Sequence, residues 1–526
     1  MNTRQRMEAL RSRQRNVPVA HAQHNAPATD LMPGWPQRVS FCPPGMQERG
    51  GECVSNLCVP HAHPLADVAR NEELLEYERT VRQRFSAIVP KLKEIAARQH
   101  ESGFEQVAQQ LAREYLGFEL PADVLADAWV TNLDMRRLYG HAVLQTYHAL
   151  ARDYNARWNM ARDTETIQRF FIDCGFHEVD VSPCADGRLK GLLQYILRIP
   201  PQAVRRRKSY AGAMFDVELS VQHWTETELR RFREGQPTLS DAGTRYLKIA
   251  VYHFSGTDPL HEGCAAHGSD GKKAAQAALD RLSAFRTAIE NGFCCGASVS
   301  TLLIGVDTDN DAIRVHVPDA QGEMSVECVI DNHSLYQQTA SMPASEARWR
   351  LSASMDEVVA QQGRSLPEPG MRRLVEQLLH NNISQIDYVC AHHDGQYADI
   401  GHDERFINIG DGFEEVSLRN LAYFGHMHTI EEGAADMDVG IKIFSKLNVA
   451  HGLPVPIAIH YRYDEQVPGA RERAVARCRR VRNAIESRYP ELSRNGLLFC
   501  AMTVQGKRPG SAHEEVQDVD AVAREH

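Results

Sequence analysis

The fold of the central part of this chain is decided by the stretch Tyr246-Leu247-Lys248-Ile249-Ala250-Val251-Tyr252-His253-Phe254. This short run is almost wholly apolar and a loop with Gly and Pro follows it, which is typical of a buried strand that ends at His253. Further short β-rich runs occur at 179–181, 301–306 and 313–317, and helical stretches such as 274–291 separate them. This alternation predicts an α/β (α+β) fold.

A thiol, a carboxylate and a guanidinium follow the strand predicted at 179–181. They are Cys184, Asp186 and Arg188, at alternate positions of the segment Cys184-Ala185-Asp186-Gly187-Arg188. On extended backbone, alternate side chains share one face. A thiolate binds zinc, a carboxylate can accept a hydrogen bond from a metal-bound water, and an arginine can hold that carboxylate with two hydrogen bonds.

A second set of possible ligands lies where the central strand ends. His253 closes the strand, and the loop after it contains His261, Cys264 and His267. Two thiolates and one imidazole would leave the fourth tetrahedral position for water, which is the arrangement of a catalytic zinc site. The residues alone leave His253 and His261 as alternative imidazole ligands.

The two halves of the chain after residue 158 contain a faint repeat. Ile249-Ala250-Val251-Tyr252-His253 resembles Ile457-Ala458-Ile459-His460-Tyr461, so we interpret 159–400 as a catalytic domain and 401–526 as a degenerate second copy. Aligned on Gly412, the positions of Cys184, Asp186, Arg188 and His253 are taken in the second copy by Leu421, Tyr423, Gly425 and Tyr461. The second copy is therefore expected to lack a metal site.

Residues 1–60 are predicted to be a disordered basic arm. They are rich in Pro, Gly, Gln, Asn, Arg and His and have little apolar periodicity. A short quasi-repeat, Thr3-Arg4-Gln5-Arg6 and Ser12-Arg13-Gln14-Arg15, places arginines around the acid Glu8. The arm is either a solvated tail or a segment that docks on an acidic partner and folds there.

Residues 61–158 are predicted to form a helical domain whose role is packing or dimerisation. The first helix is indicated by apolar residues at three- and four-residue steps or their sums: Leu74, Val81, Phe85, Ile88, Leu92 and Ile95. A second helix contains Phe104, and a third follows Pro121 and extends through Leu133.

The composition narrows the class of protein. A net charge of −10 argues against nucleic-acid binding by the chain as a whole. No apolar run approaches the roughly 18 residues that a membrane span needs, and the N-terminus shows no secretory signal, so we expect a protein that stays inside its cell. In that setting the 12 cysteines are expected to be free thiols or metal ligands.

The motifs resemble those of a known enzyme family. Cys184-x-Asp186-x-Arg188 resembles the signature of β-class carbonic anhydrases. Two further segments resemble the carboxysomal carbonic anhydrases, a divergent branch of that class. They are His261-Glu-Gly-Cys264-Ala-Ala-His267-Gly and Gly292-Phe-Cys294-Cys295-Gly-Ala-Ser-Val. The resemblance covers nearly the whole chain after residue 60.

The resemblance implies an activity and a site. The expected reaction is the reversible hydration of carbon dioxide to bicarbonate, with one zinc ion per chain held by Cys184, His253 and Cys264. The longer ligand spacing of the carboxysomal branch favours His253 over His261. Asp186 is expected to accept the hydrogen bond of the zinc-bound oxygen, and Arg188 is expected to keep Asp186 ionised and oriented. His402 is favoured over His392 and His393 as the carrier of the released proton.

The resemblance also implies a setting. The expected location is the carboxysome, within the bacterial cytoplasm, with Rubisco bound through the N-terminal arm and shell proteins as further partners. A homo-oligomer built from dimers is expected, without nucleic-acid or membrane partners. Two alternatives are a zinc-containing scaffold without activity, which would use a closed four-ligand site, and a zinc hydrolase with a roomier pocket.

Overall fold

The computed structural model describes residues 46–49, 52–55, 62–157, 161–204, 209–237, 243–293, 297–398, 401–411, 416–425, 430–508 and 511–516. The chain divides into two compact units, residues 1–55 and 56–526. In the first unit, β1 (Met46–Arg49) and β2 (Glu52–Ser55) pair as an antiparallel hairpin that the sequence did not predict. The arginine repeat of the predicted arm lies outside the described residues.

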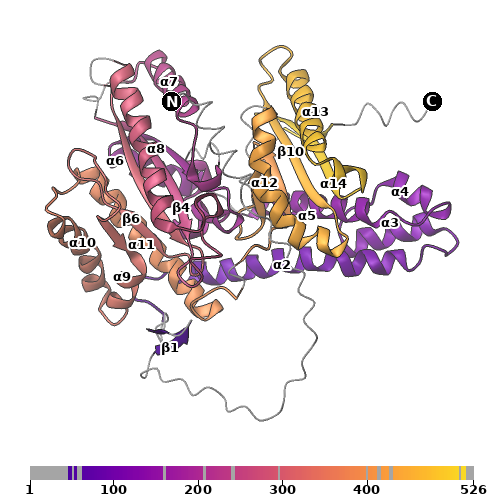
Figure 1. Cartoon of the computed structure of the whole chain (residues 1–526), viewed down its shortest axis with the longest axis horizontal. Coiled ribbons are helices and arrows are strands. Elements are labelled where there is room, and N and C mark those ends of the chain that lie inside the picture. Colours follow the sequence, from indigo (N-terminus) through magenta and orange to yellow (C-terminus); the bar gives the residue numbers. More distant parts are fainter. Residues whose placement is uncertain are drawn as a thin grey trace, which may run out of the picture. The chain divides into compact units, whose positions relative to one another are not determined.

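Helices open the second unit, as predicted for residues 61–158, but the described residues contain more of them than the three that the periodicity predicts. They are α2 (Val68–Ala96), α3 (Phe104–Tyr115), α4 (Ala122–Ala126), α5 (Met135–Arg157) and α6 (Ala161–Asp173) (Figure 1). The apolar stripe predicted for the first of them is buried in α2. The third predicted helix ends before Leu133, because the Asp134 carboxylate accepts hydrogen bonds from the amides of Arg136 and Arg137 and so starts α5.

The first sheet is built around the strand that decides the fold. Its order is β3-β4-β5-β6-β7. The strands are β3 (Phe176–Pro183), β4 (Arg245–Phe254), β5 (Val299–Asp307), β6 (Ile313–His316) and β7 (Val329–Asp331). The first three are parallel, and all of β4 after Arg245 is buried. Helices α7 (Val217–Arg233) and α8 (Gly271–Gly292) connect the parallel strands.

Three helices follow this sheet: α9 (Asn332–Thr339), α10 (Ala344–Gln361) and α11 (Pro369–His393). Short helical turns shape the connections, namely η1 (Asp127–Trp129), η2 (Gly187–Leu189), η3 (Leu192–Ile196), η4 (Pro201–Ala203), η5 (Ala211–Ala213), η6 (Ala265–His267) and η7 (Val449–His451). Among the described residues, no helix is both long and apolar enough to cross a membrane.

The second sheet has the order β12-β11-β10-β8-β9. Its strands are β8 (Phe406–Gly410), β9 (Ala422–Gly425), β10 (Val455–Tyr463), β11 (Leu498–Gly506) and β12 (His513–Glu515). The helices of this part are α12 (Ile430–Leu447), α13 (Ala470–Arg488) and α14 (Pro490–Arg494) (Figure 1). A helix joins β10 to its parallel neighbour β11, as α8 joins β4 to β5. The duplication and its domain boundaries stay predictions.

The strand pairing corrects the alignment of the two copies. Pro183 pairs with Val251 in the first sheet, and Ile409 pairs with Ile459 in the second. With β4 matched to β10, β8 therefore corresponds to β3, and Gly410 takes the position of Cys184. The predicted equivalence of Leu421, Tyr423 and Gly425 to Cys184, Asp186 and Arg188 was wrong. Tyr423 and Gly425 lie in β9 and Leu421 directly precedes it, and β9 pairs with β8 and not with β10.

Candidate metal centre

Sheet geometry brings the three predicted ligands together. Cys184 directly follows β3, His253 lies near the end of β4, and Cys264 lies in the loop after β4. One ligand atom from each side chain lies within 4.8 Å of the other two, and all three residues are buried. The carboxyl ends of neighbouring parallel strands thus form one site, which is a common position for active sites in open α/β sheets.

The chemistry of these side chains fits a metal ion. Both ring nitrogens of His253 are buried without a hydrogen-bond partner among the described residues, which is costly unless something else binds them. Nε2 lies 3.2 Å from Asp186 Oδ2 but lacks the geometry of a hydrogen bond. A hydrogen bond from Cys264 holds the pKa of Cys184 well below its ordinary value, although burial opposes the shift, and the Gly212 amide donates to Cys184 Sγ at 3.3 Å.

The other two histidines of the loop turn away from this cluster. The His261 side chain is 76% exposed, and its Nδ1 lies 2.9 Å from Asp258 Oδ1. A ring nitrogen of His267 lies 3.1 Å from the Gly212 carbonyl oxygen. Of the two alternative imidazole ligands, the structure therefore places His253 with the thiols and leaves His261 outside.

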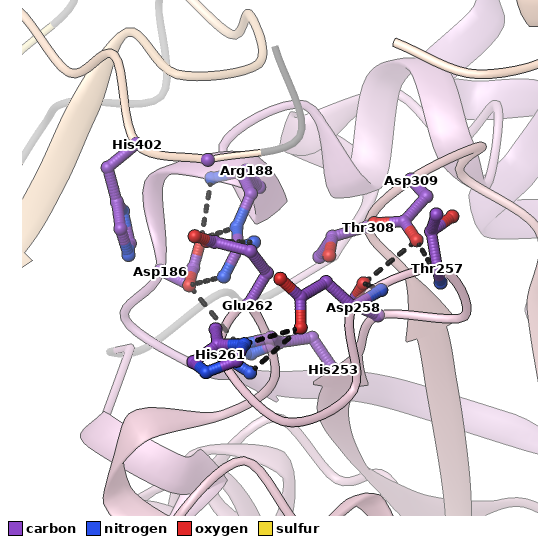
Figure 2. A network of polar contacts seen from close by, with 12 residues as sticks. Asp186, Arg188, His253, Thr257, Asp258, His261, Glu262, Thr308, Asp309 and His402 are labelled. Carbon is purple, nitrogen blue, oxygen red and sulfur yellow. Dashed lines mark hydrogen bonds and ion pairs between the residues drawn. The ribbon is translucent and has the colours of Figure 1, made fainter. Parts of the chain in front are cut away.

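Asp186 and Arg188 form a buried ion pair beside the cluster (Figure 2). Arg188 donates from Nε to Oδ1 at 2.9 Å and from Nη2 to Oδ2 at 2.8 Å. Burial raises the pKa of Asp186, but the charge of Arg188, with smaller contributions from His253 and His402, outweighs it and holds the pKa well below its ordinary value. Asp186 is therefore an ionised hydrogen-bond acceptor next to the ligands.

His402 reaches this pair from the segment before β8. Its Nδ1 lies 2.8 Å from Glu404 Oε1, and polar atoms of Asp186, His402 and Glu404 lie within 4.8 Å of one another. The Arg188 guanidinium on Asp186 makes this second cluster a poor site for a cation. Burial lowers the pKa of His402, but the charges of Glu404 and Asp186 outweigh burial and raise it overall.

The other two candidate proton carriers are placed elsewhere. His392 and His393 end α11, where both rings lie against Tyr388. His393 Nε2 is also 3.5 Å from a carboxylate oxygen of Glu78. Neither belongs to the metal-ligand cluster or to the His402 cluster.

Residues from the second half of the chain close over the loop that follows Cys184. The Asn420 amide donates to the Gly187 carbonyl oxygen at 2.9 Å, and the Phe424 amide donates to that of Ala185 at 3.3 Å. A Cβ atom on Gly187 would lie only 2.5 Å from Glu404 Oε1, so glycine leaves the room that this carboxylate occupies. The site therefore uses both halves of the chain.

Two carboxylates anchor the start of the loop that carries Cys264. Asp309 Oδ2 accepts a hydrogen bond from the Thr257 amide at 2.7 Å (Figure 2). It also accepts one from the Ser255 hydroxyl at 2.8 Å. Asp307 Oδ1 accepts from the Gly256 amide at 3.2 Å, and burial together with the charge of Asp309 raises the pKa of Asp307 to about 7. Farther along the same loop, Glu262 approaches Arg188 Nη1 at 3.5 Å.

Sequence reasoning missed the supporting residues Glu262, Glu404, Asp307 and Asp309. Their roles depend on contacts between distant parts of the chain, which no local pattern shows. Two local signs were present, since Glu262 lies inside the segment His261-Glu-Gly-Cys264 and Glu404 lies two residues after His402.

Comparison with known proteins identifies the family. Models of the Carboxysome Shell Carbonic Anhydrase family match residues 63–155 (N-terminal), 166–402 (catalytic domain) and 403–520 (C-terminal). The carboxysome shell carbonic anhydrase of Halothiobacillus neapolitanus is 46% identical over 98% of this chain and 99% of its own length. Those of Prochlorococcus marinus and Parasynechococcus marenigrum are 47% and 48% identical, each over 92% of this chain and over 95% and 83% of their own lengths. The chain therefore belongs to the carboxysome shell carbonic anhydrases, the family that its metal-site motifs resemble.

Proposed function

We propose that this carbonic anhydrase works in the carboxysome with one zinc ion per chain, held by Cys184, His253 and Cys264. The observation that carries the proposal is the buried Cys-His-Cys cluster with the ionised Asp186 beside it. Two thiolates and an imidazole suit zinc, and three protein ligands leave a coordination position open. When bound, zinc supplies the Lewis acidity that makes water a nucleophile near neutral pH.

Asp186 is proposed to orient the reacting water. Its carboxylate is ionised, so it can accept a hydrogen bond from that water and direct a lone pair of the water oxygen at carbon dioxide. The Arg188 guanidinium donates one hydrogen bond to each carboxylate oxygen and fixes the plane of the group. This arrangement leaves the free lone pairs of Asp186 for the reacting molecule.

His402 is proposed to carry the released proton to solvent. Hydration of carbon dioxide to bicarbonate releases one proton in each turnover. The His402 side chain is 26% exposed, whereas the neighbouring Asp186 side chain is only 7% exposed. His402 thus connects the buried site with water outside, and an imidazole gains and loses protons near neutral pH.

One experiment tests the zinc proposal on the purified full-length chain. Metal content is measured by mass spectrometry and carbon dioxide hydration by stopped-flow, before and after treatment with a chelator. We expect about one zinc per chain, activity that disappears with the metal, and recovery when zinc is returned. Full activity in metal-free protein would overturn the proposal.

The partners are proposed on chemical grounds. An arm with several arginines suits an acidic surface, and Rubisco consumes the carbon dioxide that this site releases, so we infer that the arm tethers Rubisco. Shell proteins are further proposed partners, and the chain is proposed to assemble as a homo-oligomer of dimers. Size measurement by light scattering tests the assembly, and a monomer at all concentrations would contradict it.

A further inference from the structure

Glu404 is a buried acidic residue beside the metal centre. It is 2% exposed, and its Oε2 is buried without a hydrogen-bond partner among the described residues. A buried carboxylate oxygen without a hydrogen-bond partner destabilises the folded chain, because it has lost its hydration and gained nothing in return. A carboxylate in this position is therefore expected to serve a purpose other than stability.

The one polar side chain bonded to Glu404 in the described structure is His402. His402 Nδ1 lies 2.8 Å from Glu404 Oε1, and a carboxylate there fixes the ring proton on Nδ1. Nε2 is then the nitrogen that gains and loses a proton. The glycine at position 187 admits the carboxylate, since a Cβ atom there would lie 2.5 Å from Oε1.

From this geometry we propose that Glu404 is a positioning residue for proton export, which holds the ring and the tautomer of His402 so that Nε2 accepts the proton released at the metal centre. The proton moves onto Nε2 to give the imidazolium, and it then leaves from Nε2 to water or buffer, which restores the same neutral tautomer. The inference rests on the proposed role of His402.

The charges that face His402 support this role. Glu404 lies on its own segment, and Asp186 and Arg188 face it from the loop after β3. Glu262, from the loop after β4, lies against Arg188 and near Gly401. Among these groups, Glu404 and Asp186 raise the pKa of His402, while Arg188 opposes them. Loss of the Glu404 charge should therefore lower the pKa of His402.

The test uses Glu404→Gln, Glu404→Ala and His402→Ala in the zinc-loaded full chain. In weak buffer, we expect kcat to fall about 10-fold in Glu404→Ala and less in Glu404→Gln, because the amide oxygen still accepts from Nδ1. The value of kcat/KM should stay within about twofold, because it reports the chemical step rather than proton export. Imidazole buffer should restore kcat, because it carries the proton instead.

A measurement independent of activity follows the His402 ring itself. Diethyl pyrocarbonate acylates neutral imidazole, so the rate at which the His402 peptide is modified, followed by mass spectrometry against pH, gives its pKa. We expect the midpoint to move to lower pH in Glu404→Gln. A matched control is Glu228→Gln, because Glu228 Oε1 lies 2.7 Å from His177 Nε2 in a similar buried pair outside the metal centre. The control should leave both the buffer dependence of kcat and the His402 midpoint unchanged.

The outcomes separate the inference from the role of His402. If His402→Ala shows no loss of kcat in weak buffer, the proposed role of His402 is wrong. If His402→Ala shows the loss but Glu404→Gln matches the wild type in both kcat and midpoint, only the inference about Glu404 is wrong. The double variant, His402→Ala with Glu404→Ala, should be no slower than His402→Ala alone. An additive loss of kcat together with reduced zinc content would show that the role of Glu404 is merely structural.

Discussion

The backbone amide of Cys184 donates a hydrogen bond to the carbonyl oxygen of Val251 at 2.9 Å, two residues before His253. The pairing of β3 with β4 therefore fixes a thiol from one strand beside an imidazole from the next. Rigid strands hold side chains more precisely than loops do, so two of the three proposed ligands are preorganised by the sheet. Cys264 completes the set from a loop that Asp307 and Asp309 anchor.

Removing any one proposed ligand should release the metal. Cys184→Ser, His253→Ala and Cys264→Ser are each expected to lose zinc and to show no hydration above the uncatalysed rate, because two protein ligands do not retain zinc. His261→Ala is the control and should keep both its zinc and its hydration activity, since the His261 side chain is exposed outside the cluster. Stoichiometric zinc in His253→Ala, together with loss of zinc in His261→Ala, would reverse the assignment.

Asp186→Asn should separate metal binding from catalysis. The amide has nearly the same shape but lacks the charge, so we expect zinc to remain while kcat/KM falls by about 100-fold to 10,000-fold. Metal analysis and stopped-flow kinetics on the same preparation measure the two effects. Near-normal kcat/KM in Asp186→Asn would refute the proposed role.

His316 should make stability depend on pH. The ring lies between the Tyr252 hydroxyl at 2.9 Å and the Ser325 carbonyl oxygen at 3.1 Å, which together suit the neutral form, and burial lowers its pKa from 6.5 to about 4. Between pH 4 and 6.5 the His316 imidazole binds a proton in the unfolded chain but not in the folded chain. The stability that the neutral, buried ring contributes is therefore fully present above about pH 6.5 and is lost as the pH falls toward 4.

Urea unfolding at several pH values checks this prediction. In His316→Gln, the slope of unfolding free energy against pH between 4 and 6.5 should be smaller than in the wild type, by up to about 1.4 kcal/mol per pH unit for the one proton involved. Equal slopes in the two proteins would show that His316 titrates alike in the folded and unfolded chains.

Gly410 should tolerate no side chain. Its φ is +107°, and a Cβ atom would collide with the His460 carbonyl oxygen, so we expect Gly410→Ala to destabilise the fold by about 3 kcal/mol or more. Gly452→Ala is the matched control, because its φ is +74° but nothing lies within 4 Å, and it should cost about 1–2 kcal/mol. Thermal unfolding compares the two variants, and equal losses would contradict the close approach of Gly410 to the His460 carbonyl oxygen.

Deleting residues 1–60 should abolish Rubisco binding while zinc content and hydration activity remain. Individual contacts between exposed charges are weak, so binding should depend on several arginines together and fall steeply with salt. Replacing Arg4, Arg6, Arg13 and Arg15 by alanine should have nearly the same effect. The measurement is surface binding to immobilised Rubisco at low and high salt. If the truncated chain binds Rubisco as well as the full chain does, the arm is only a solvated tail.

Local patterns predicted those parts of the molecule that local forces determine. The apolar run at 246–254 forms β4, and the apolar steps from Leu74 to Ile95 are buried in α2. The alignment on Gly412 was wrong because strand pairing depends on residues far apart in the sequence. A locally similar segment therefore assigned to β9 the position that β8 occupies. Glu404 was missed for the same reason, since its burial against Gly187, more than 200 residues earlier in the chain, is a long-range contact.

The contact of Asn420 and Glu404 with Gly187 has a consequence for how the enzyme responds to dilution. An active site closed by a second molecule dissociates when the protein becomes scarce. Here the closing residues belong to the same polypeptide, so their effective concentration is set by the connecting chain and not by the number of copies nearby. A solitary chain of this enzyme would carry a closed active site, whatever assembly it later joins.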